Sequence, residues 1–312
     1  MDSTCLSRPR SALLRIIYWA GLVGLTLGML SQAAASSLRV IDADAHYPES
    51  PLWHDGRLFY VEYSANNIKT WDNHHVQIYW HRDHCGPAAV FAFQDHLLVA
   101  CTDENALVEL DKDAKVVRVI KSDDAGNPLT GPNDFCSDGH GGVYFTDSGL
   151  YDIKAPITGT VVHLTPDRKL TLVANTIHYS NGLVVANDGT HLLVAEMLAG
   201  RILSFPVEQG GQLGLRTVWA RMDDLASRTP NEDAYNGPDG VKLGPDKLYY
   251  VAQNGSGRVL VVNDERRTVR TIDVPTPYVT NIGFGTHGEV YISGAFEQWK
   301  EPYHGAVYEW TP

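Results

Sequence analysis

The chain has 312 residues, of which 44% are hydrophobic and 10% aromatic, enough for one large or two ordinary domains with a real core. Its formal net charge of −12 makes it a poor candidate for a nucleic-acid-binding protein, because phosphate binding needs a basic patch. Glycine and proline are scattered along the chain, so no linker or low-complexity tract is predicted.

The first 35 residues differ in composition from the rest of the chain. Three arginines precede an apolar run at residues 16–30, and the small-residue segment Ala33-Ala34-Ala35 follows it. This order is typical of a secretory signal peptide, and the run is shorter than the ~20 residues of a spanning helix. We therefore predict a signal peptide over residues 1–35 and an exported protein, periplasmic or secreted. The alternative is an uncleaved leader that acts as a membrane anchor.

Cleavage would leave Cys85, Cys101 and Cys136. An exported protein can hold one disulfide and one free thiol among them, but the sequence does not say which cysteines pair. Asn254-Gly255-Ser256 is a glycosylation sequon, which matters only in a eukaryotic host.

After the leader, short apolar runs are separated by Gly, Pro, Asn and Asp, the pattern of an all-β protein. The runs fall into groups of four, and the second run of each group begins near Leu58, Leu97, Val143, Leu192, Leu248 and Val290. A spacing of roughly 40 to 55 residues is typical of a propeller with four strands per blade. We predict one domain over residues 36–312, a six-bladed β-propeller.

The sixth group lacks its fourth run, and an unused run, Leu38-Arg39-Val40-Ile41, lies before the first group. We expect this N-terminal strand to pair in the last blade, because that closes the ring without an open edge.

The segments that lead into the innermost strands share a polar side chain. Five of the six carry one, and the segment of the second blade has Ala88 instead; the five are Glu49, Asn133, Asn181, Asp239 and Asn281. Inner strands of a propeller begin at one mouth of the central channel, so these side chains are expected to converge there. Carboxylate and carboxamide oxygens form a hard-oxygen set that suits Ca²⁺, Mg²⁺ or Mn²⁺. The alternative is that each is a turn residue that satisfies its local backbone.

Several motifs resemble the gluconolactonase and senescence-marker-protein (regucalcin-like) family over essentially all of residues 38–312. They are Glu49-Ser50-Pro51-Leu52-Trp53, Pro132-Asn133-Asp134, Tyr144-Phe145-Thr146-Asp147, Ser180-Asn181-Gly182-Leu183 and Pro238-Asp239-Gly240. The resemblance implies a six-bladed propeller with one divalent metal ion in its channel, Ca²⁺ first, with Mg²⁺, Mn²⁺ or Zn²⁺ as alternatives. It implies Glu49, Asn181 and Asp239 as metal ligands, Asn133 as a residue that contacts the metal directly or through water and binds substrate, and Asp239 also as the general base.

One departure concerns the substrate. The animal sugar-lactone hydrolases of the family carry an arginine where this chain has Gly131, so sugar-acid lactones are not the only substrates to consider. A metal-dependent lactonase is the first interpretation. An organophosphate or other ester hydrolase on the same site, or a non-catalytic ligand-binding propeller, are the alternatives.

Other polar and aromatic residues have weaker signals. Asn281 and His178, which lies three residues before Asn181, are further candidates for substrate contact. Asp147 is expected to serve a turn. Three aromatic residues could line the pocket wall, but core or surface packing is the stronger expectation for each, and four histidines are expected at the surface; these seven are Trp53, Tyr235, Tyr303, His74, His75, His81 and His84.

Overall fold

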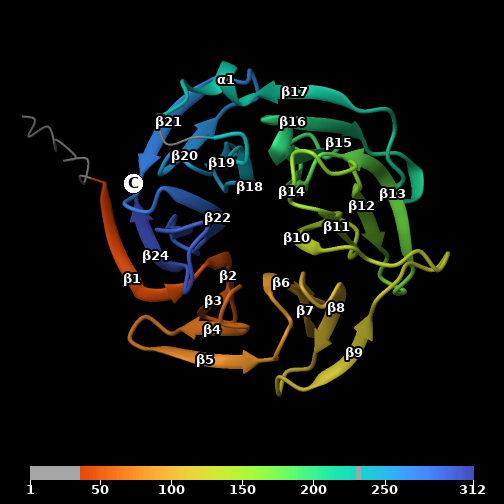
Figure 1. Cartoon of the computed structure of the whole chain (residues 1–312), viewed down its shortest axis with the longest axis horizontal. Helices are drawn as coiled ribbons and strands as arrows, with labels where there is room; N and C mark the ends of the chain where they lie inside the picture. Colours follow the sequence, from red (N-terminus) through yellow and green to blue (C-terminus); the bar gives the residue numbers. More distant parts are fainter. Residues whose placement is uncertain (1–35, 230–232) are drawn as a thin grey trace, which may run out of the picture. The chain divides into compact units, whose positions relative to one another are not determined.

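The computed structural model describes residues 36–229 and 233–312, so the predicted signal peptide lies outside the described residues. Within them the chain forms six four-stranded antiparallel sheets around a central axis (Figure 1). This confirms the predicted six-bladed β-propeller. The helical segments of the described residues are short: α1 (Met222–Leu225) and the 3₁₀ turns η1 (Met197–Ala199) and η2 (Gln209–Gly211).

Each blade runs from an inner strand at the axis to an outer strand at the rim (Figure 1). The first three blades are β2 (Pro48–His54), β3 (Arg57–Glu62), β4 (Asn67–Trp71) and β5 (Val76–His81); β6 (Pro87–Phe93), β7 (His96–Cys101), β8 (Ala106–Leu110) and β9 (Val116–Ile120); and β10 (Pro132–Ser137), β11 (Val143–Asp147), β12 (Gly159–Leu164) and β13 (Leu170–Ile177). The fourth and fifth are β14 (Ser180–Val185), β15 (His191–Glu196), β16 (Arg201–Pro206) and β17 (Thr217–Arg221); and β18 (Pro238–Leu243), β19 (Tyr249–Gln253), β20 (Arg258–Val262) and β21 (Thr268–Asp273). The sixth is β22 (Tyr278–Phe284), β23 (Val290–Ala295), β24 (His304–Thr311) and β1 (Ser37–His46).

The middle strands of the blades are buried on both faces. All five residues of β8 and of β11 are buried, whereas β9 at the rim is largely exposed. One core cluster joins Phe59 and Val61 of the first blade to Val90 and Val99 of the second. Because each middle strand is covered by the blades on either side, its sequence is a continuous apolar run rather than an alternating one.

Strand β1 closes the ring, as predicted, and is longer than the run seen in the sequence. It pairs antiparallel with β24, from Ser37 opposite Thr311 to His46 opposite His304. Among its ten residues only Asp42 and Ala45 are buried. Hydrogen bonds and a few buried contacts therefore hold the N-terminal strand in place, rather than a large apolar face.

Asp42 also ties the closing strand to the first blade. Its carboxylate accepts a hydrogen bond of 2.6 Å from the Tyr60 hydroxyl and one of 3.0 Å from Lys69 Nζ. Lys69 is in turn 2.8 Å from Glu62. Burial alone would raise the pKa of Asp42, but hydrogen bonds from Tyr60, the Asp44 amide and Lys69 outweigh it and hold the pKa below the usual 3.8.

A disulfide joins Cys85, two residues before β6, to Cys101 at the end of β7. This is one of the pairings that the sequence left open, and it leaves Cys136 as a free, buried thiol. Burial raises the pKa of Cys136 to about 12, so this thiol stays protonated and unreactive.

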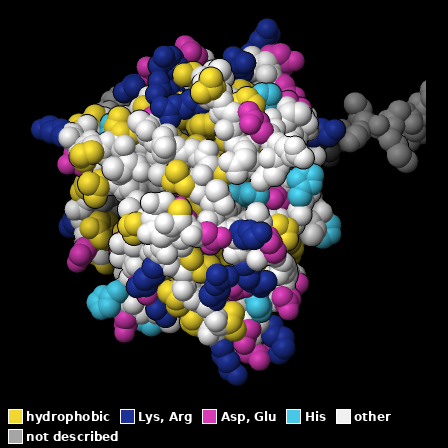
Figure 2. Space-filling model, turned by 90° about the vertical axis from the view of Figure 1, so that its right-hand side faces the viewer, with side chains coloured by type: hydrophobic (Ala, Val, Ile, Leu, Met, Phe, Trp, Pro, Cys, Tyr) yellow, Lys and Arg dark blue, Asp and Glu magenta, His cyan; other side chains and the backbone are white. Residues whose placement is uncertain are grey.

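The surface of the described residues is mixed in charge. On the side of the ring shown in Figure 2, basic and acidic side chains are interspersed with histidines and apolar groups. Within residues 36–229 and 233–312, no helix has the length and apolar character needed to cross a bilayer.

Replacing Asp42 with Asn tests the tie between the closing strand and the first blade. Because the folded pKa of Asp42 is lowered, its ionised form stabilises the protein above pH 3.8, and this contribution is lost as the pH falls through the folded pKa. We expect Asp42→Asn to cost about 1–3 kcal/mol at pH 7 in urea unfolding, and less below pH 4. The exposed Asp55→Asn is the matched control, and equal stability of wild type and Asp42→Asn at pH 7 would contradict the assignment.

Candidate metal centre and active site

The inner strands share a break in their β-ladders near the axis. The pairing between each inner strand and its neighbour shifts register between Pro87 and Ala89 in β6 and at the equivalent place in the other five blades. Asn133, Asn181 and Asp239 lie inside these breaks, and Glu49 borders the break in β2. A bulge redirects a side chain away from its normal face, so these irregularities point one residue of a blade toward the axis.

Glycines that follow two of these residues permit the inner strands to approach each other closely. A Cβ on Gly182 would lie 2.4 Å from the carbonyl oxygen of Asp239, and one on Gly240 would lie 2.3 Å from Asn281 Oδ1. Neither glycine is among those with a positive φ, and both lie inside strands. Asn181-Gly182 and Asp239-Gly240 are therefore sites of close packing at the axis, not the turns that the alternative interpretation supposed.

The polar side chains converge on a cavity of about 230 Å³. Four of the five predicted residues line it, namely Glu49, Asn133, Asn181 and Asp239, and Ala88 of the second blade lines it too. The other lining residues are Tyr47, Tyr63, Thr102, Tyr151, Tyr179, Met197, Gln298, Trp299 and Tyr303. Asp239 and Asn181 are almost completely buried, at 3% and 5% exposed, while Glu49 and Asn133 are partly open.

Asn281 and His178 lie outside the lining of this cavity. Pro238 in the fifth blade pairs with the last residue of β19, and Tyr278 in the sixth blade pairs in the same way with the last residue of β23. The residue that follows Pro238 is Asp239, so its counterpart in the sixth blade is the residue that follows Tyr278, namely Val279. Asn281 lies further along the strand, where its Oδ1 accepts a hydrogen bond from the Ile282 amide and its side chain bonds to Glu49. His178 donates its backbone N–H to Glu196, and its Nε2 is buried without a hydrogen-bond partner.

Burial and neighbouring negative charge raise the pKa of both carboxylates of the cavity. Burial, and then the negative charges of Asp239 and Asp134, raise the pKa of Glu49 well above its usual 4.5. Burial and the charge of Asp134 likewise raise the pKa of Asp239, although the hydrogen bond from Asn254 opposes the rise. Two buried carboxyl groups cannot both ionise at low cost unless a cation lies beside them.

One oxygen of Asp239 identifies where that cation would bind. Its Oδ2 accepts a hydrogen bond of 3.1 Å from Asn254 Nδ2, whereas its Oδ1 is buried and has no hydrogen-bond partner. The amide nitrogen of Asn181 lies 3.3 Å from the sulfur of Met197. A buried carboxylate oxygen without a donor is costly, and coordination to a hard cation would satisfy it. The residues present therefore fit a divalent metal held by Glu49, Asn181 and Asp239.

A chain of hydrogen bonds that the sequence did not reveal runs from Asp239 to Tyr151 in the aromatic wall of the cavity. Asn236 Nδ2 donates to Asn254 Oδ1 at 2.9 Å and to Gln298 Oε1 at 3.1 Å, and Gln298 Nε2 donates to the Tyr151 hydroxyl at 2.6 Å. Each amide is thereby fixed in orientation, so Asn254 presents a donor to Asp239. Asn254 is fully buried in this network, which makes the sequon at residues 254–256 an unsuitable acceptor for a glycan.

Aromatic residues form the cavity wall. Tyr151 packs against Tyr179 at a centroid distance of 4.7 Å and stacks on Trp299 at 5.9 Å. Tyr47, Tyr179 and Tyr303 have φ values of 49°, 62° and 58°, a left-handed backbone that costs a non-glycine residue about 1–2 kcal/mol. Strain of this kind at three lining residues is typical of a functional site.

The remaining sequence predictions have mixed outcomes. Tyr303 lines the cavity, and Tyr235 packs on the lining residue Trp299. Trp53 stacks on Tyr291 against the core, which confirms the packing role expected for it and excludes it from the cavity wall. Asp147 accepts hydrogen bonds from the Thr130 amide, which confirms a structural role. The surface placement of His74, His75, His81 and His84 is confirmed.

An ion pair lies behind the cavity and was not predicted. Lys242 Nζ of the fifth blade is 2.6 Å from Asp134 Oδ2 of the third blade and also donates to the carbonyl oxygen of Phe135. Both side chains line a second cavity of about 270 Å³. The pair therefore spans the channel between blades that are not neighbours.

The chain is thus a six-bladed propeller whose inner strands bring carboxylate and carboxamide side chains together in one cavity. The family model described as SMP-30/Gluconolactonase/LRE-like region matches residues 47–295, and the chain belongs to this family. A lactonase, drp35, of Staphylococcus aureus (strain MRSA252) is 31% identical over 146 residues, which are 46% of this chain and 42% of that protein. The chain therefore matches less than half the length of that relative.

Solved structures share the fold. A gluconolactonase from Xanthomonas campestris superposes with a TM-score of 0.72 at 19% identity, covering 88% of this chain and 89% of that one. A calcium-binding regucalcin from Agrobacterium tumefaciens superposes with a TM-score of 0.72 at 17% identity, covering 88% and 92%. At these identities the likeness establishes the architecture alone.

The unpaired carboxylates make a prediction for the metal-free protein. Their folded pKa values are raised, so their stabilising effect is complete below the unfolded values near 3.8 and 4.5 and is lost as the pH rises. In excess EDTA at pH 7, we expect Asp239→Asn to be more stable than wild type by at least about 1 kcal/mol, with the difference vanishing near pH 4. Asp134→Asn is the contrasting control, because it strands Lys242 and destabilises. A metal-free Asp239→Asn protein less stable than wild type at pH 7 would contradict the electrostatic assignment.

Proposed function

We propose that the protein is an exported, divalent-metal-dependent hydrolase of lactones. The observation that carries this proposal is the buried Asp239 oxygen without a donor, next to Glu49 and Asn181 in a cavity open to small molecules. Membership of a family with gluconolactonase in its description supports the substrate class. Oxygen-only ligands favour Ca²⁺, and a fold relative described as calcium-binding agrees with this choice. Mg²⁺, Mn²⁺ and Zn²⁺ are alternatives that metal analysis distinguishes.

The residues divide the work of lactone hydrolysis among them. Glu49, Asn181 and Asp239 would hold the cation, which when bound supplies a Lewis acid for the lactone carbonyl. Asn133 lines the same cavity and can donate its amide N–H to a substrate oxygen. Asp239 takes a proton from the water that attacks the carbonyl carbon. The ring C–O bond then breaks, and that proton goes to the departing ring oxygen to give the hydroxy acid.

Asn254 acts as a positioning residue in this scheme. Its Nδ2 donates a hydrogen bond to Oδ2 of Asp239, which leaves the other carboxylate oxygen, Oδ1, outside the amide network. Because Asn236 and Gln298 fix the Asn254 amide, the Asp239 carboxylate has one defined orientation.

The cavity wall favours an apolar or aromatic substrate. Among the described residues that line it, Glu49 and Asp239 are the only charged ones, and both are proposed metal ligands. Gly131 has a φ of 121°, a backbone conformation that excludes the arginine found in the sugar-lactone hydrolases of the family. We infer that the substrate is a neutral lactone whose apolar portion lies against Tyr151 and Trp299.

The disulfide between Cys85 and Cys101 supports the proposed export. Structural disulfides persist in oxidising compartments, such as the periplasm and the extracellular space, and are rare in the cytosol of mesophiles.

The metal requirement is tested with a panel of lactones, paraoxon and matched variants. We expect chelator-sensitive lactone hydrolysis that is restored by metal, loss of turnover in Asp239→Asn, and weaker metal binding in Glu49→Gln. The exposed Asp55→Asn controls for the loss of a carboxylate outside the site. Full activity of Asp239→Asn would refute its assigned role, turnover of paraoxon without lactones would favour the organophosphatase, and no turnover of any ester would favour the binding propeller.

The substrate class is tested by replacing one exposed aromatic residue. Trp299→Ala should raise KM for an aryl-substituted lactone by about 3- to 10-fold, with a smaller change for an unsubstituted lactone, because it removes a stacking surface. Phe296→Ala is the matched control, since Phe296 lies on the same loop and is exposed but does not line the cavity. A preference for polyhydroxylated sugar lactones that Trp299→Ala leaves unchanged would overturn the inference.

A further inference from the structure

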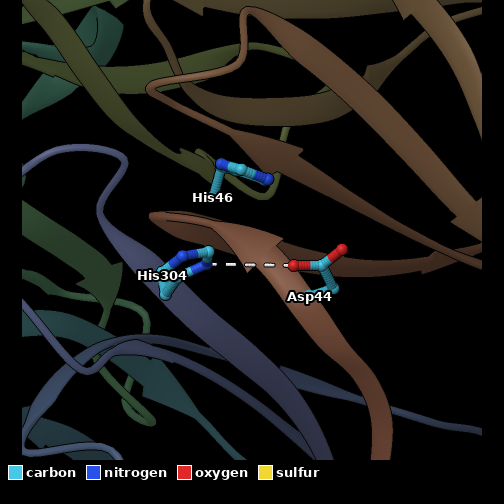
Figure 3. A group of neighbouring side chains, drawn as sticks. All are labelled: Asp44, His46 and His304. Atoms are coloured by element: carbon cyan, nitrogen blue, oxygen red, sulfur yellow. Dashed lines mark ion pairs between the residues drawn. The ribbon is translucent and has the colours of Figure 1, made fainter.

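A second group of possible metal ligands lies where the ring is closed, apart from the central carboxylates. Among the described residues, Asp44, His46 and His304 present ligand atoms that all lie within 4.8 Å of one another (Figure 3). His46 is the register partner of His304 on β24, and Asp44 lies on β1 within the register shift between Asp42 and Ala45. Strand pairing therefore places the two histidines side by side, and the irregular stretch of β1 next to them supplies the carboxylate.

The hydrogen bond of His46 defines which of its nitrogens can bind a cation. Its Nδ1 lies 3.3 Å from the backbone carbonyl oxygen of Pro302. A carbonyl oxygen can only accept, so Nδ1 carries the proton and the lone pair is on Nε2. An imidazole whose second nitrogen donates to a carbonyl is the usual arrangement of a metal-bound histidine, because that bond orients the ring and strengthens the ligand.

His304 and Asp44 already face each other. His304 Nδ1 lies 3.8 Å from Asp44 Oδ1, as the dashed line in Figure 3 marks. The rings of His304 and His46 are 5.6 Å apart between centroids. Among the ion pairs of the described residues, none joins Asp44 to a lysine or arginine, so its charge is available to a cation.

We propose that Asp44, His46 and His304 form a second metal site, which takes a borderline cation of the Zn²⁺ class rather than Ca²⁺. Two imidazole nitrogens and one carboxylate are ligands that Zn²⁺, Ni²⁺ and Cu²⁺ prefer, whereas the central site offers oxygen alone. Ligand atoms around Zn²⁺ lie ~3.3 Å apart, so the side chains must draw together. Asp44 and His304 are 85% and 49% exposed, which leaves them free to rotate.

A cation here would cross-link the two ends of the propeller domain. His46 ends β1 and His304 begins β24, the strand pair that closes the ring. The next residues toward the channel, Tyr47 and Tyr303, line the central cavity, and the Tyr47 amide donates to the Tyr303 carbonyl at 2.7 Å. The site would therefore stabilise both the ring closure and one wall of the cavity.

The test is a titration of untagged protein with ZnCl₂ in saturating CaCl₂, followed by calorimetry and thermal unfolding. We expect one Zn²⁺ per chain and a rise in Tm. His46→Ala/His304→Ala should weaken Zn²⁺ binding at least about 10-fold and abolish the rise. His74→Ala/His75→Ala is the matched control, because it removes two exposed histidines elsewhere on the surface. Asp239→Asn should keep the Zn²⁺ response, which separates this site from the central one.

Spectroscopy provides a second measurement that does not depend on the double variant. Cu²⁺ bound to wild type should show an electron paramagnetic resonance spectrum with two imidazole nitrogens, and His304→Ala should show one. No Zn²⁺ binding by wild type, or equal binding by wild type and the double histidine variant, would overturn the proposal. A Zn²⁺ response lost in Asp239→Asn would assign the ion to the central site instead.

Discussion

The site depends on two carboxylates brought together at the axis of the ring, one of which, Asp239, has a buried oxygen without a hydrogen-bond donor. Glu49 comes from the first blade and Asp239 from the fifth, so only the closed propeller places them in one cavity. Burial raises the pKa of both carboxylates, and nearby negative charge adds to the rise, from Asp239 and Asp134 at Glu49 and from Asp134 at Asp239. Under the proposed function, such a pair of carboxylates would weaken the metal-free fold and favour a bound cation for the same reason.

The fold stabilises this arrangement from several directions. Breaks in the β-ladders turn the ligands inward, and small residues such as Gly182 allow neighbouring inner strands to pack closely. Asn254 donates a hydrogen bond to one oxygen of Asp239, and Asn236 and Gln298 connect the Asn254 amide to Tyr151 in the cavity wall. Behind the cavity, Lys242 lowers the pKa of Asp239, which opposes the larger effect of its ion-pair partner Asp134.

The sequence was informative where a pattern repeats and uninformative where contacts are single. The six blades and the closing strand follow from apolar runs at a regular spacing, because every blade buries its apolar strands against its neighbours in the same way. Four of the five predicted polar residues line the cavity for the same reason. Asn281 does not, because the register of the sixth blade places Val279 at the ligand position.

The amide network, the Lys242 ion pair and the aromatic wall could not be predicted, because their members lie on different blades and loops. Gln298 and Tyr151 are 147 residues apart in sequence and meet only in the folded ring. Asn254 was visible only as a sequon, a pattern that says nothing of its burial. Long-range contacts between unlike residues have no period to reveal them.

The most direct test of the central claim is anomalous diffraction from crystals of the protein loaded with Mn²⁺. A single peak at the axis, within coordinating distance of Glu49, Asn181 and the free oxygen of Asp239, is the result that this account predicts. A catalytically active, Mn²⁺-loaded protein whose anomalous peak lies away from these three side chains would contradict it.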